Sequence, residues 1–203
     1  MSDTIDRATF DKIYAERPPW DIDGPQAPFT TLTLSGTLLD SGCGSGENGL
    51  YFAARGVTVT GVDFLEAPIA QAREKARARG LEASATFLTR DALTLGDWDR
   101  RFDNAIDSGL MHVFSDADRA TYLAGVAHVL VPGGRLHVLC FSDQTPGTEG
   151  PRRIKRAELD AAFARGWVLE SATPARFVVR DEFKATRFGG QDPHGWFVIA
   201  RRS

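Results

Sequence analysis

The chain has 203 residues, of which 42% are hydrophobic and 25% are charged, and its formal net charge is −3. This length and composition fit one domain with its own core, and the small negative charge offers no cationic surface for nucleic acid. Because no stretch reaches the roughly 18 apolar residues of a membrane span and the charged N-terminus has no apolar signal segment, we expect a cytoplasmic protein without nucleic-acid or membrane partners.

The first 36 residues precede the first predicted strand and are too short to form a domain of their own. They contain a helical segment, about Asp6 to Glu16, followed by a proline-rich turn. We expect this segment (residues 1–36) to be a lid over a binding site and residues 37–203 to form the single domain.

From Thr37 onward, short β-rich runs alternate with helical stretches, a pattern typical of a parallel sheet with right-handed crossovers. Five strands are predicted here, over Thr37–Asp40, Val57–Asp63, Ala85–Thr89, Phe102–Asp107 and Arg135–Phe141. Crossover helices are predicted over Glu66–Arg79 and Asp116–Leu130, which end before Gly80 and before Pro132-Gly133-Gly134.

The last third of the chain has a different pattern. A helix is predicted over Ile154–Ala164, followed by strands over Trp167–Thr173, Arg176–Val179 and Trp196–Arg201 that are joined without helices. This indicates an antiparallel hairpin at the C-terminal edge of the sheet. The predicted fold class is therefore α/β: a Rossmann-like, doubly wound, mostly parallel seven-stranded sheet with that hairpin.

A glycine-rich turn follows the first strand, which ends at Asp40, and passes through Gly42, Gly44 and Gly46. Glycine is needed where the backbone takes positive φ or approaches a ligand closely. A nicotinamide-binding fingerprint would place the third glycine at position 47, which is Glu, so the spacing favours S-adenosylmethionine (SAM). SAM presents a cationic sulfonium and an ammonium group, for which Asp40 would supply the opposite charge. A purely structural turn is the alternative.

The second strand ends in Asp63, followed by Phe64. A carboxylate at this position can accept hydrogen bonds from both ribose hydroxyls of a nucleoside. We therefore assign both residues to the cofactor site. A helix N-cap is the alternative for Asp63.

Four further residues lie at the same predicted sheet edge. Asp91 could accept a hydrogen bond from the adenine amino group while the amide of Ala92 meets a ring nitrogen, although a solvated loop acid is equally compatible. Asp107 and Ser108 follow the fourth strand, at the edge where open α/β sheets bind ligands. We include these four residues in the cofactor site.

Together these motifs resemble the class I SAM-dependent methyltransferases. The resemblance rests on Asp40 to Gly46, Asp63, Asp91-Ala92 and Leu130 to Gly134, and covers about Leu38 to Phe141. It implies SAM as the cofactor and S-adenosylhomocysteine (SAH) as the product, and it says little about the acceptor.

Four other segments are similar to small actinobacterial benzoquinone or heterocyclic-toxin methyltransferases, relatives of the thiopurine methyltransferase type. These segments are Pro18–Gln26, Asp107–Arg119, Leu136–Asp143 and Gly150–Arg153. The resemblance implies a quinolone-like aromatic acceptor and a detoxifying role, and it implies that Trp20 packs on the methionine part of SAM, which also fits an aromatic ring beside a sulfonium. A core position is the alternative for Trp20.

Two residues are candidates for removing a proton from the acceptor. His112 directly follows the fourth strand and histidine titrates near neutral pH, as a general base requires, although a pocket wall in contact with substrate is the other interpretation. Asp143, after the fifth strand, is the competing base or a turn residue.

The acceptor pocket is expected to be apolar and aromatic. Its predicted residues are Phe10, Tyr14, Met111, His112, Phe114 and Phe141, with Phe188 as a further candidate.

The sequence therefore predicts a SAM-dependent N- or O-methyltransferase acting on a small quinolone- or quinone-like acceptor. The alternatives are a thiol S-methyltransferase, an NAD(P)-dependent reductase and a non-catalytic SAM-binding module. No metal is expected, since no His and carboxylate cluster has ligand spacing, and Cys43 and Cys140 are expected to be reduced thiols.

Overall fold

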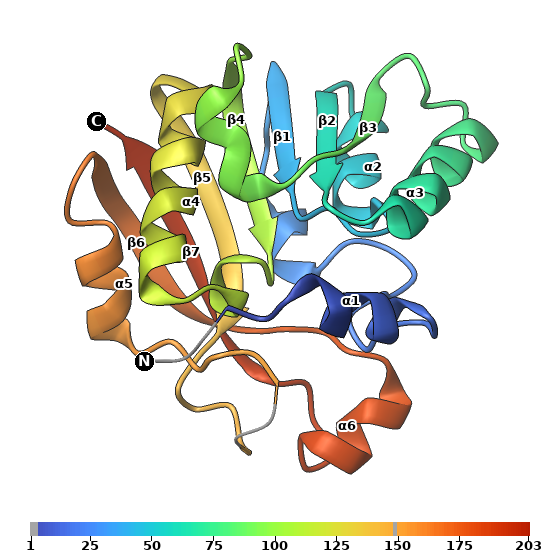
Figure 1. The fold of residues 1–203 in the computed structure, drawn as a ribbon, viewed down its shortest axis with the longest axis vertical. Helices are drawn as coiled ribbons and strands as arrows, with labels where there is room; N and C mark the ends of the chain where they lie inside the picture. Colours follow the sequence, from blue (N-terminus) through green and yellow to red (C-terminus); the bar gives the residue numbers. More distant parts are fainter. Residues whose placement is uncertain (1–3, 148–149) are drawn as a thin grey trace.

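Seven strands form a single sheet in the order β3-β2-β1-β4-β5-β7-β6 (Figure 1). The structure, a computed structural model, describes residues 4–147 and 150–203. The strands are β1 (Thr37–Ser41), β2 (Thr58–Asp63), β3 (Ala85–Thr89), β4 (Phe102–Ser108), β5 (Leu130–Phe141), β6 (Trp167–Arg176) and β7 (His194–Arg202). β1 to β5 pair in parallel, whereas β7 is antiparallel to both β5 and β6. The predicted fold class is confirmed.

Helices cover both faces of this sheet. The helices of the described residues are α1 (Arg7–Tyr14), α2 (Glu47–Ala53), α3 (Glu66–Ala78), α4 (Asp116–Val129), α5 (Arg156–Ala162) and α6 (Asp181–Arg187), with short 3-10 turns η1 (Ala27–Thr31), η2 (Ala92–Asp97) and η3 (Met111–Val113). Of these helices, α1 and α6 have no buried residues and are not among those that cover the faces of the sheet. One hydrophobic cluster joins the sheet to α4, α5 and η2, and a second joins it to α2, α3 and η1. The core therefore consists of two layers, one on each face of the sheet.

The central strands contain apolar runs because helices cover both faces of the sheet. Leu38 and Leu39 are both fully buried in β1, but Leu38 packs in the α2/α3 cluster and Leu39 in the α4/α5 cluster. Successive side chains of a strand point to opposite faces, so a strand covered on both sides is apolar at every position.

The C-terminal region differs from its prediction in two respects. The strand predicted over Arg176–Val179 is wrong, because β6 runs on to Arg176 and residues 177–180 belong to no strand. The hairpin is also not free of helices, since α6 lies between β6 and β7. The signal for α6 is a first turn with Asp181 and Glu182 and a last turn with Lys184 and Arg187, charges that complement the helix dipole.

The region around Pro132-Gly133-Gly134 also differs in its bounds. β5 begins at Leu130, before this segment, and its pairing with β4 shifts register there. A shift of this kind lets a proline and two glycines lie inside a strand.

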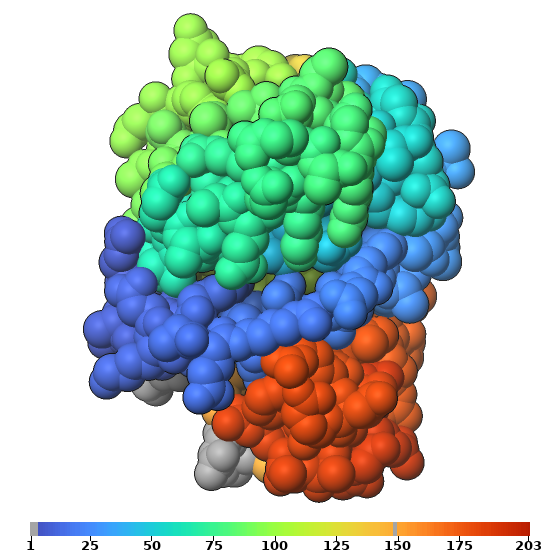
Figure 2. Space-filling model, turned by 90° about the vertical axis from the view of Figure 1, so that its right-hand side faces the viewer, coloured from blue at the N-terminus to red at the C-terminus, as the bar shows by residue number. Residues whose placement is uncertain are grey.

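The N-terminal segment crosses the carboxyl ends of the parallel strands. In Figure 1 α1 lies below the lower end of β2, and the amide of Ile5 donates to the carbonyl of Val113 (2.9 Å) in the loop after β4. In Figure 2 this blue segment lies between the green and cyan part of the molecule and the orange-red C-terminal part. Among the described residues, no helix has both the length and the apolar character needed to cross a membrane.

Candidate functional site

A cavity of about 980 Å³ lies between the carboxyl ends of β1 to β4 and the N-terminal segment. Its wall combines the glycine turn, the ends of β2 and β3, the loop after β4, the end of β5 and residues from 177 to 188. Ligand pockets span about 300–1,000 Å³, so this cavity is large enough for a cofactor together with a second small molecule.

The three glycines of the turn all have left-handed backbone, with φ of 69° at Gly42, 51° at Gly44 and 86° at Gly46. Gly42 and Gly44 line the cavity, where a ligand can approach the bare backbone. Gly46 does not line it; a Cβ there would lie 2.9 Å from Ala72 and from Phe87. Two glycines therefore serve the cavity, and the third permits close packing beneath it.

Asp40 lies behind the turn rather than in the cavity. Its side chain is fully buried and accepts the amide of Gly49 (2.9 Å) at the start of α2. Burial raises the pKa of Asp40 to about 7, and the bond from Gly49 opposes this rise. Asp40 therefore contacts α2 and does not line the cavity, where its carboxylate was expected to face the positively charged groups of SAM.

Asp107 is likewise turned into the core. Its carboxylate accepts the amides of Leu110 (2.8 Å) and Met111 (3.0 Å) and the hydroxyl of Tyr122 (2.9 Å). Burial raises its pKa to about 7. Asp107 therefore shapes the loop after β4, while its neighbour Ser108 lines the cavity.

Asp63 has the position predicted for a ribose-binding acid. It ends β2, lines the cavity and is 8% exposed. One carboxylate oxygen accepts the amide of Leu65 (3.0 Å) and the other that of Gly44 (3.1 Å), while burial raises the pKa of this carboxyl. Each oxygen has a second lone pair that could accept a hydroxyl proton. Phe64, beside it, also lines the cavity.

Asp91 and Ala92 line the cavity where β3 leads into η2. One oxygen of Asp91 caps η2 by accepting the amide of Leu93 (2.9 Å). Together with the bare backbone at Gly42 and Gly44 and the carboxylate of Asp63, this arrangement suits the nucleoside part of SAM.

Sequence reasoning missed Asp21, an acid that does line the cavity. It accepts the hydroxyl proton of Ser45 (2.5 Å) and lies 4.0 Å from the Lys75 ammonium, so it joins the N-terminal segment to the glycine turn and α3. Its signal was its place directly after Trp20, in a segment where only the tryptophan was assigned.

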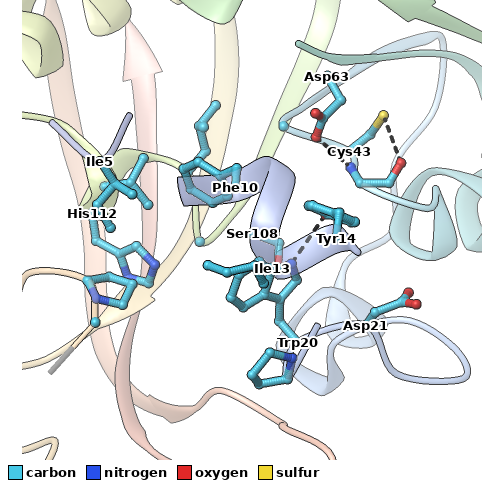
Figure 3. A pocket seen from close by; sticks show the side chains of 18 of the residues that line it. Ile5, Phe10, Ile13, Tyr14, Trp20, Asp21, Cys43, Asp63, Ser108 and His112 are labelled. Atoms are coloured by element: carbon cyan, nitrogen blue, oxygen red, sulfur yellow. Dashed lines mark hydrogen bonds between the residues drawn. The ribbon is translucent and has the colours of Figure 1, made fainter. Parts of the chain in front are cut away.

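Aromatic side chains of the N-terminal segment form the roof of the cavity (Figure 3). The indole N–H of Trp20 donates to the Tyr14 hydroxyl (3.3 Å), and Phe10 packs edge-on against both Trp20 (6.2 Å between ring centroids) and Phe64 (5.6 Å). Partial burial of Tyr14, with the charge of Asp63, raises the pKa of its phenol well above the ordinary value, so the phenol stays protonated. Such a roof suits a cationic sulfonium.

His112 lies on the opposite side of the cavity from Asp63 in Figure 3 and is buried. Its Nδ1 accepts the amide of Phe141 (2.9 Å), which assigns the proton of the neutral ring to Nε2. Burial and then the charge of Arg153 lower its pKa to about 3, against a hydrogen bond with Gly109. Because the acceptor nitrogen of the neutral ring already accepts the amide of Phe141, His112 is better suited to positioning a substrate than to removing its proton.

The remaining predicted residues separate into two groups. Phe114 and Phe141 line the cavity, joined by Phe177, Phe188 and Arg153. Met111 is fully buried in the core, and the exposed Asp143 borders a neighbouring cavity of about 500 Å³. The structure brings neither Met111 nor Asp143 to the main cavity.

Comparison with known sequences points to one family of enzymes. A family model described as a methyltransferase domain matches residues 38–134. The 2-heptyl-1-hydroxyquinolin-4(1H)-one methyltransferase of Mycobacteroides abscessus is 32% identical over 198 residues, which cover 92% of this chain and 87% of that protein. The demethylmenaquinone methyltransferase of Thermus thermophilus is 40% identical over 115 residues, or 56% of this chain and 50% of that protein.

Solved structures agree. A protein studied for the conversion of a disulfide bond into a thioacetal group during echinomycin biosynthesis has a TM-score of 0.84 at 33% identity, over 97% of this chain and 92% of that chain. The 1,6-didemethyltoxoflavin-N1-methyltransferase of Burkholderia thailandensis, solved with bound 1,6-didemethyltoxoflavin and SAH, has a TM-score of 0.70 over 97% of this chain and 83% of that chain. Its 22% identity shows a shared fold.

Proposed function

The chain belongs to the SAM-dependent methyltransferases, and from this premise we propose that it methylates an oxygen or nitrogen atom of a small aromatic or heterocyclic acceptor of the hydroxyquinolone or quinone type. In this proposal residues 37–203 are the methyltransferase domain and residues 1–36 are its lid. The observation that carries the acceptor class is the aromatic end of the cavity, beyond the residues suited to the cofactor.

That end is built from rings in edge-to-face contact. Phe141 packs against Phe177 (5.2 Å between centroids), Phe188 (5.9 Å) and the imidazole of His112 (4.7 Å). Aromatic walls with few polar groups favour a flat, apolar acceptor. The Mycobacteroides abscessus relative, which matches most of the chain, is named for such a molecule.

The cofactor residues are proposed from their positions on the cavity wall. Asp63 would accept the ribose hydroxyls, Asp91 and the amide of Ala92 would meet the adenine, and Trp20 would pack on the methionine part. When bound, SAM supplies a methyl group on a positively charged sulfur. The glycine turn and Phe64, Ser108 and Asp21 would complete its surroundings, with Asp40, Gly46 and Asp107 as support behind the wall.

The chain's own contribution to methyl transfer is orientation and exclusion of water. An in-line displacement at carbon is accelerated when the acceptor is held against the methyl group in a closed site. The hydrogen bond from Phe141 fixes His112, and Phe10 and Tyr14 close the roof. An acidic N-hydroxyl can lose its proton to water, so for such an acceptor neither His112 nor Asp143 needs to act as a base.

The test is methyl transfer from SAM to 2-heptyl-1-hydroxyquinolin-4(1H)-one, followed by mass spectrometry. We expect the acceptor to gain one methyl group and SAH to form in equal amount. Binding of SAH without methylation of this or any other hydroxyquinolone or hydroxyquinone would contradict the acceptor class. Methylation that lowers the toxicity of the acceptor to cultured bacteria would support a detoxifying role.

A second candidate is methyl transfer to a thiol. The relative studied for thioacetal formation from a disulfide matches nearly the whole chain and shares 33% of its residues, which favours sulfur as an acceptor atom. Thiophenols in the same assay separate the two candidates, because turnover of thiophenols without turnover of hydroxyquinolones would favour sulfur.

A further inference from the structure

The side chain of Gln26 joins two segments that are far apart in sequence. It is 2% exposed, its amide nitrogen donates to the carbonyl of Val178 (2.9 Å), and its carbonyl oxygen accepts the amide of Val178 (2.8 Å). A carboxamide offers one donor and one acceptor side by side, so it pairs with a peptide unit as a neighbouring strand would. Gln26 thus satisfies the backbone of a segment that belongs to no strand.

We name the two joined segments the strap, residues 17–26, and the flap, residues 177–180. Two further hydrogen bonds connect them: the amide of Arg180 donates to the carbonyl of Pro19 (2.9 Å), and its guanidinium donates to the carbonyl of Arg17 (2.6 Å). In Figure 2 the blue N-terminal segment lies directly against the orange-red C-terminal part. Strap and flap therefore meet along several residues, with Gln26 as the buried contact.

Gln26 is also attached to the cofactor end of the cavity. Its own amide donates to the side-chain carbonyl of Asn48 (2.9 Å), in the first turn of α2 directly after the glycine turn. From the same strap, Trp20 and Asp21 line the cavity beside that turn. A ligand held by the glycine turn and the strap therefore fixes the backbone that carries Gln26.

The flap forms part of the acceptor end. Phe177 and Val179, on either side of the peptide held by Gln26, are both buried and both line the cavity. The ring of Phe177 lies 5.2 Å from that of Phe141 and 6.1 Å from the imidazole of His112, between centroids. A displacement of Val178 would move two residues of the acceptor wall.

We propose that Gln26 is a positioning residue that couples cofactor binding to the closure of the acceptor pocket. Cofactor contacts order the strap, Gln26 transmits that order to Val178, and Phe177 and Val179 then complete the aromatic wall. Coupling between two sites is reciprocal, so a bound acceptor tightens the hold on the cofactor by the same factor. The proposal rests on the proposed function for its acceptor.

The first test replaces Gln26 with Met, which keeps the length and removes both hydrogen bonds. The reporter is the amide of Phe177, because it donates to the carbonyl of Pro193 (3.0 Å) and the substitution leaves that bond intact. In the wild type, we expect saturating SAH to slow hydrogen exchange of this amide about tenfold, as measured by NMR, and this protection to be lost in Gln26→Met.

Binding and turnover give the second readout of the same variant. In Gln26→Met the KM for 2-heptyl-1-hydroxyquinolin-4(1H)-one should rise about tenfold, while the Kd for SAH alone changes by less than about threefold. Gln71→Met, at an exposed glutamine of α3, is the matched control and should behave as the wild type. Equal SAH protection of the Phe177 amide in wild type and Gln26→Met, or none in the wild type, would overturn the proposal.

A second variant tests the proposal in case Gln26→Met does not fold. Gln26→Glu in its protonated form reproduces both hydrogen bonds, whereas the ionised form directs a charged oxygen at the carbonyl of Val178. Burial raises the pKa of a carboxyl, so SAH protection of the Phe177 amide should be present near about pH 5 and lost near about pH 8 in this variant only. Protection that does not change with pH would contradict the role of Gln26.

The exchange measurement uses SAH alone and needs no acceptor. Absence of turnover with normal SAH protection would therefore contradict the proposed acceptor and leave the role of Gln26 standing. Normal turnover of the acceptor together with unchanged SAH protection in Gln26→Met would contradict the role of Gln26 and leave the proposed acceptor standing.

Discussion

The acids at the strand ends divide between the cavity and the core. Asp63 and Asp91 line the cavity, whereas Asp40 and Asp107 are fully buried behind it: Asp40 accepts one amide of α2, and Asp107 accepts two amides of the loop after β4. Burial raises the pKa of both buried acids to about 7. Because the folded-state pKa exceeds the ordinary value of 3.8, their contribution to stability is full below about pH 4 and is lost as the pH rises through 7.

His137 has the opposite dependence on pH. Both ring nitrogens are buried without a hydrogen-bond partner in the described part of the chain, and burial, with the charge of Arg135, lowers the pKa from 6.5 to about 4. The folded state therefore disfavours the proton, and stability present above pH 6.5 is lost as the pH falls toward 4. We expect His137→Leu to raise the free energy of unfolding by about 3 kcal/mol more at about pH 4 than at about pH 8.

Urea unfolding at the two pH values measures this difference. His128→Leu is the matched control, because His128 is exposed on α4 and the substitution makes the same chemical change outside the core. A gain from His137→Leu that is equal at both pH values would show that the ring is not buried in its neutral form.

At the scale of elements, α1 is the weakest part of the roof. It has eight residues, none of them buried, and its N-cap Asp6 accepts the amide of Thr9 (2.8 Å). Helices this short are marginal without tertiary packing, and loss of an N-cap costs about 1 kcal/mol. We expect Asp6→Ala to speed hydrogen exchange of the α1 amides and to raise the acceptor KM about fivefold, without a change in the midpoint of global thermal unfolding.

Asp11→Ala is the control within the same helix, since Asp11 is exposed and is not the cap. A lower global midpoint in Asp6→Ala, or equal effects of both substitutions on exchange, would mean that α1 unfolds only with the whole domain.

The elements that the sequence predicted well are those with local signals. β3 has the predicted bounds, and β1, β2 and β4 differ by single residues, because apolar runs ending in acids or glycines mark the strands. Residues 177–180 could not be predicted this way, since Val178 pairs with the side chain of Gln26, 152 residues away.

The candidate site shows the same limit at the level of side chains. Position at a strand end predicted that Asp63, Asp91 and Ser108 would meet the cavity. It could not predict that Asp40 and Asp107 turn inward, because their orientation depends on amides from α2 and from the loop after β4 that fold back onto them.

Across the whole molecule, the cavity wall draws on segments from Thr4 to Phe188, so a bound ligand links most of the chain. SAH at about one hundred times its Kd should stabilise the folded state by about 2.7 kcal/mol, which for a chain of this size raises Tm by about 5–10 °C. Asp63→Asn should lose most of this shift at the same SAH concentration, because it replaces the carboxylate that is proposed to accept the ribose hydroxyls with an amide. Differential scanning calorimetry with and without SAH measures both values.

Asp99→Asn, at an exposed acid, is the control for the change of charge and should keep the full shift. Equal SAH shifts in Asp63→Asn and the wild type would remove Asp63 from the cofactor site.

The strand order also fixes a sequence of events during synthesis. β6 lies at the edge of the sheet and pairs with β7, which follows it in the chain but lies between β6 and β5 in space. A ribosome adds about 5–20 residues per second, so the nascent chain carries an unpaired β6 for about one to five seconds until His194 to Arg202 has been added. During that interval an open strand edge is available to chaperones and to other nascent chains, and the speed of translation through residues 177–202 sets how long it lasts.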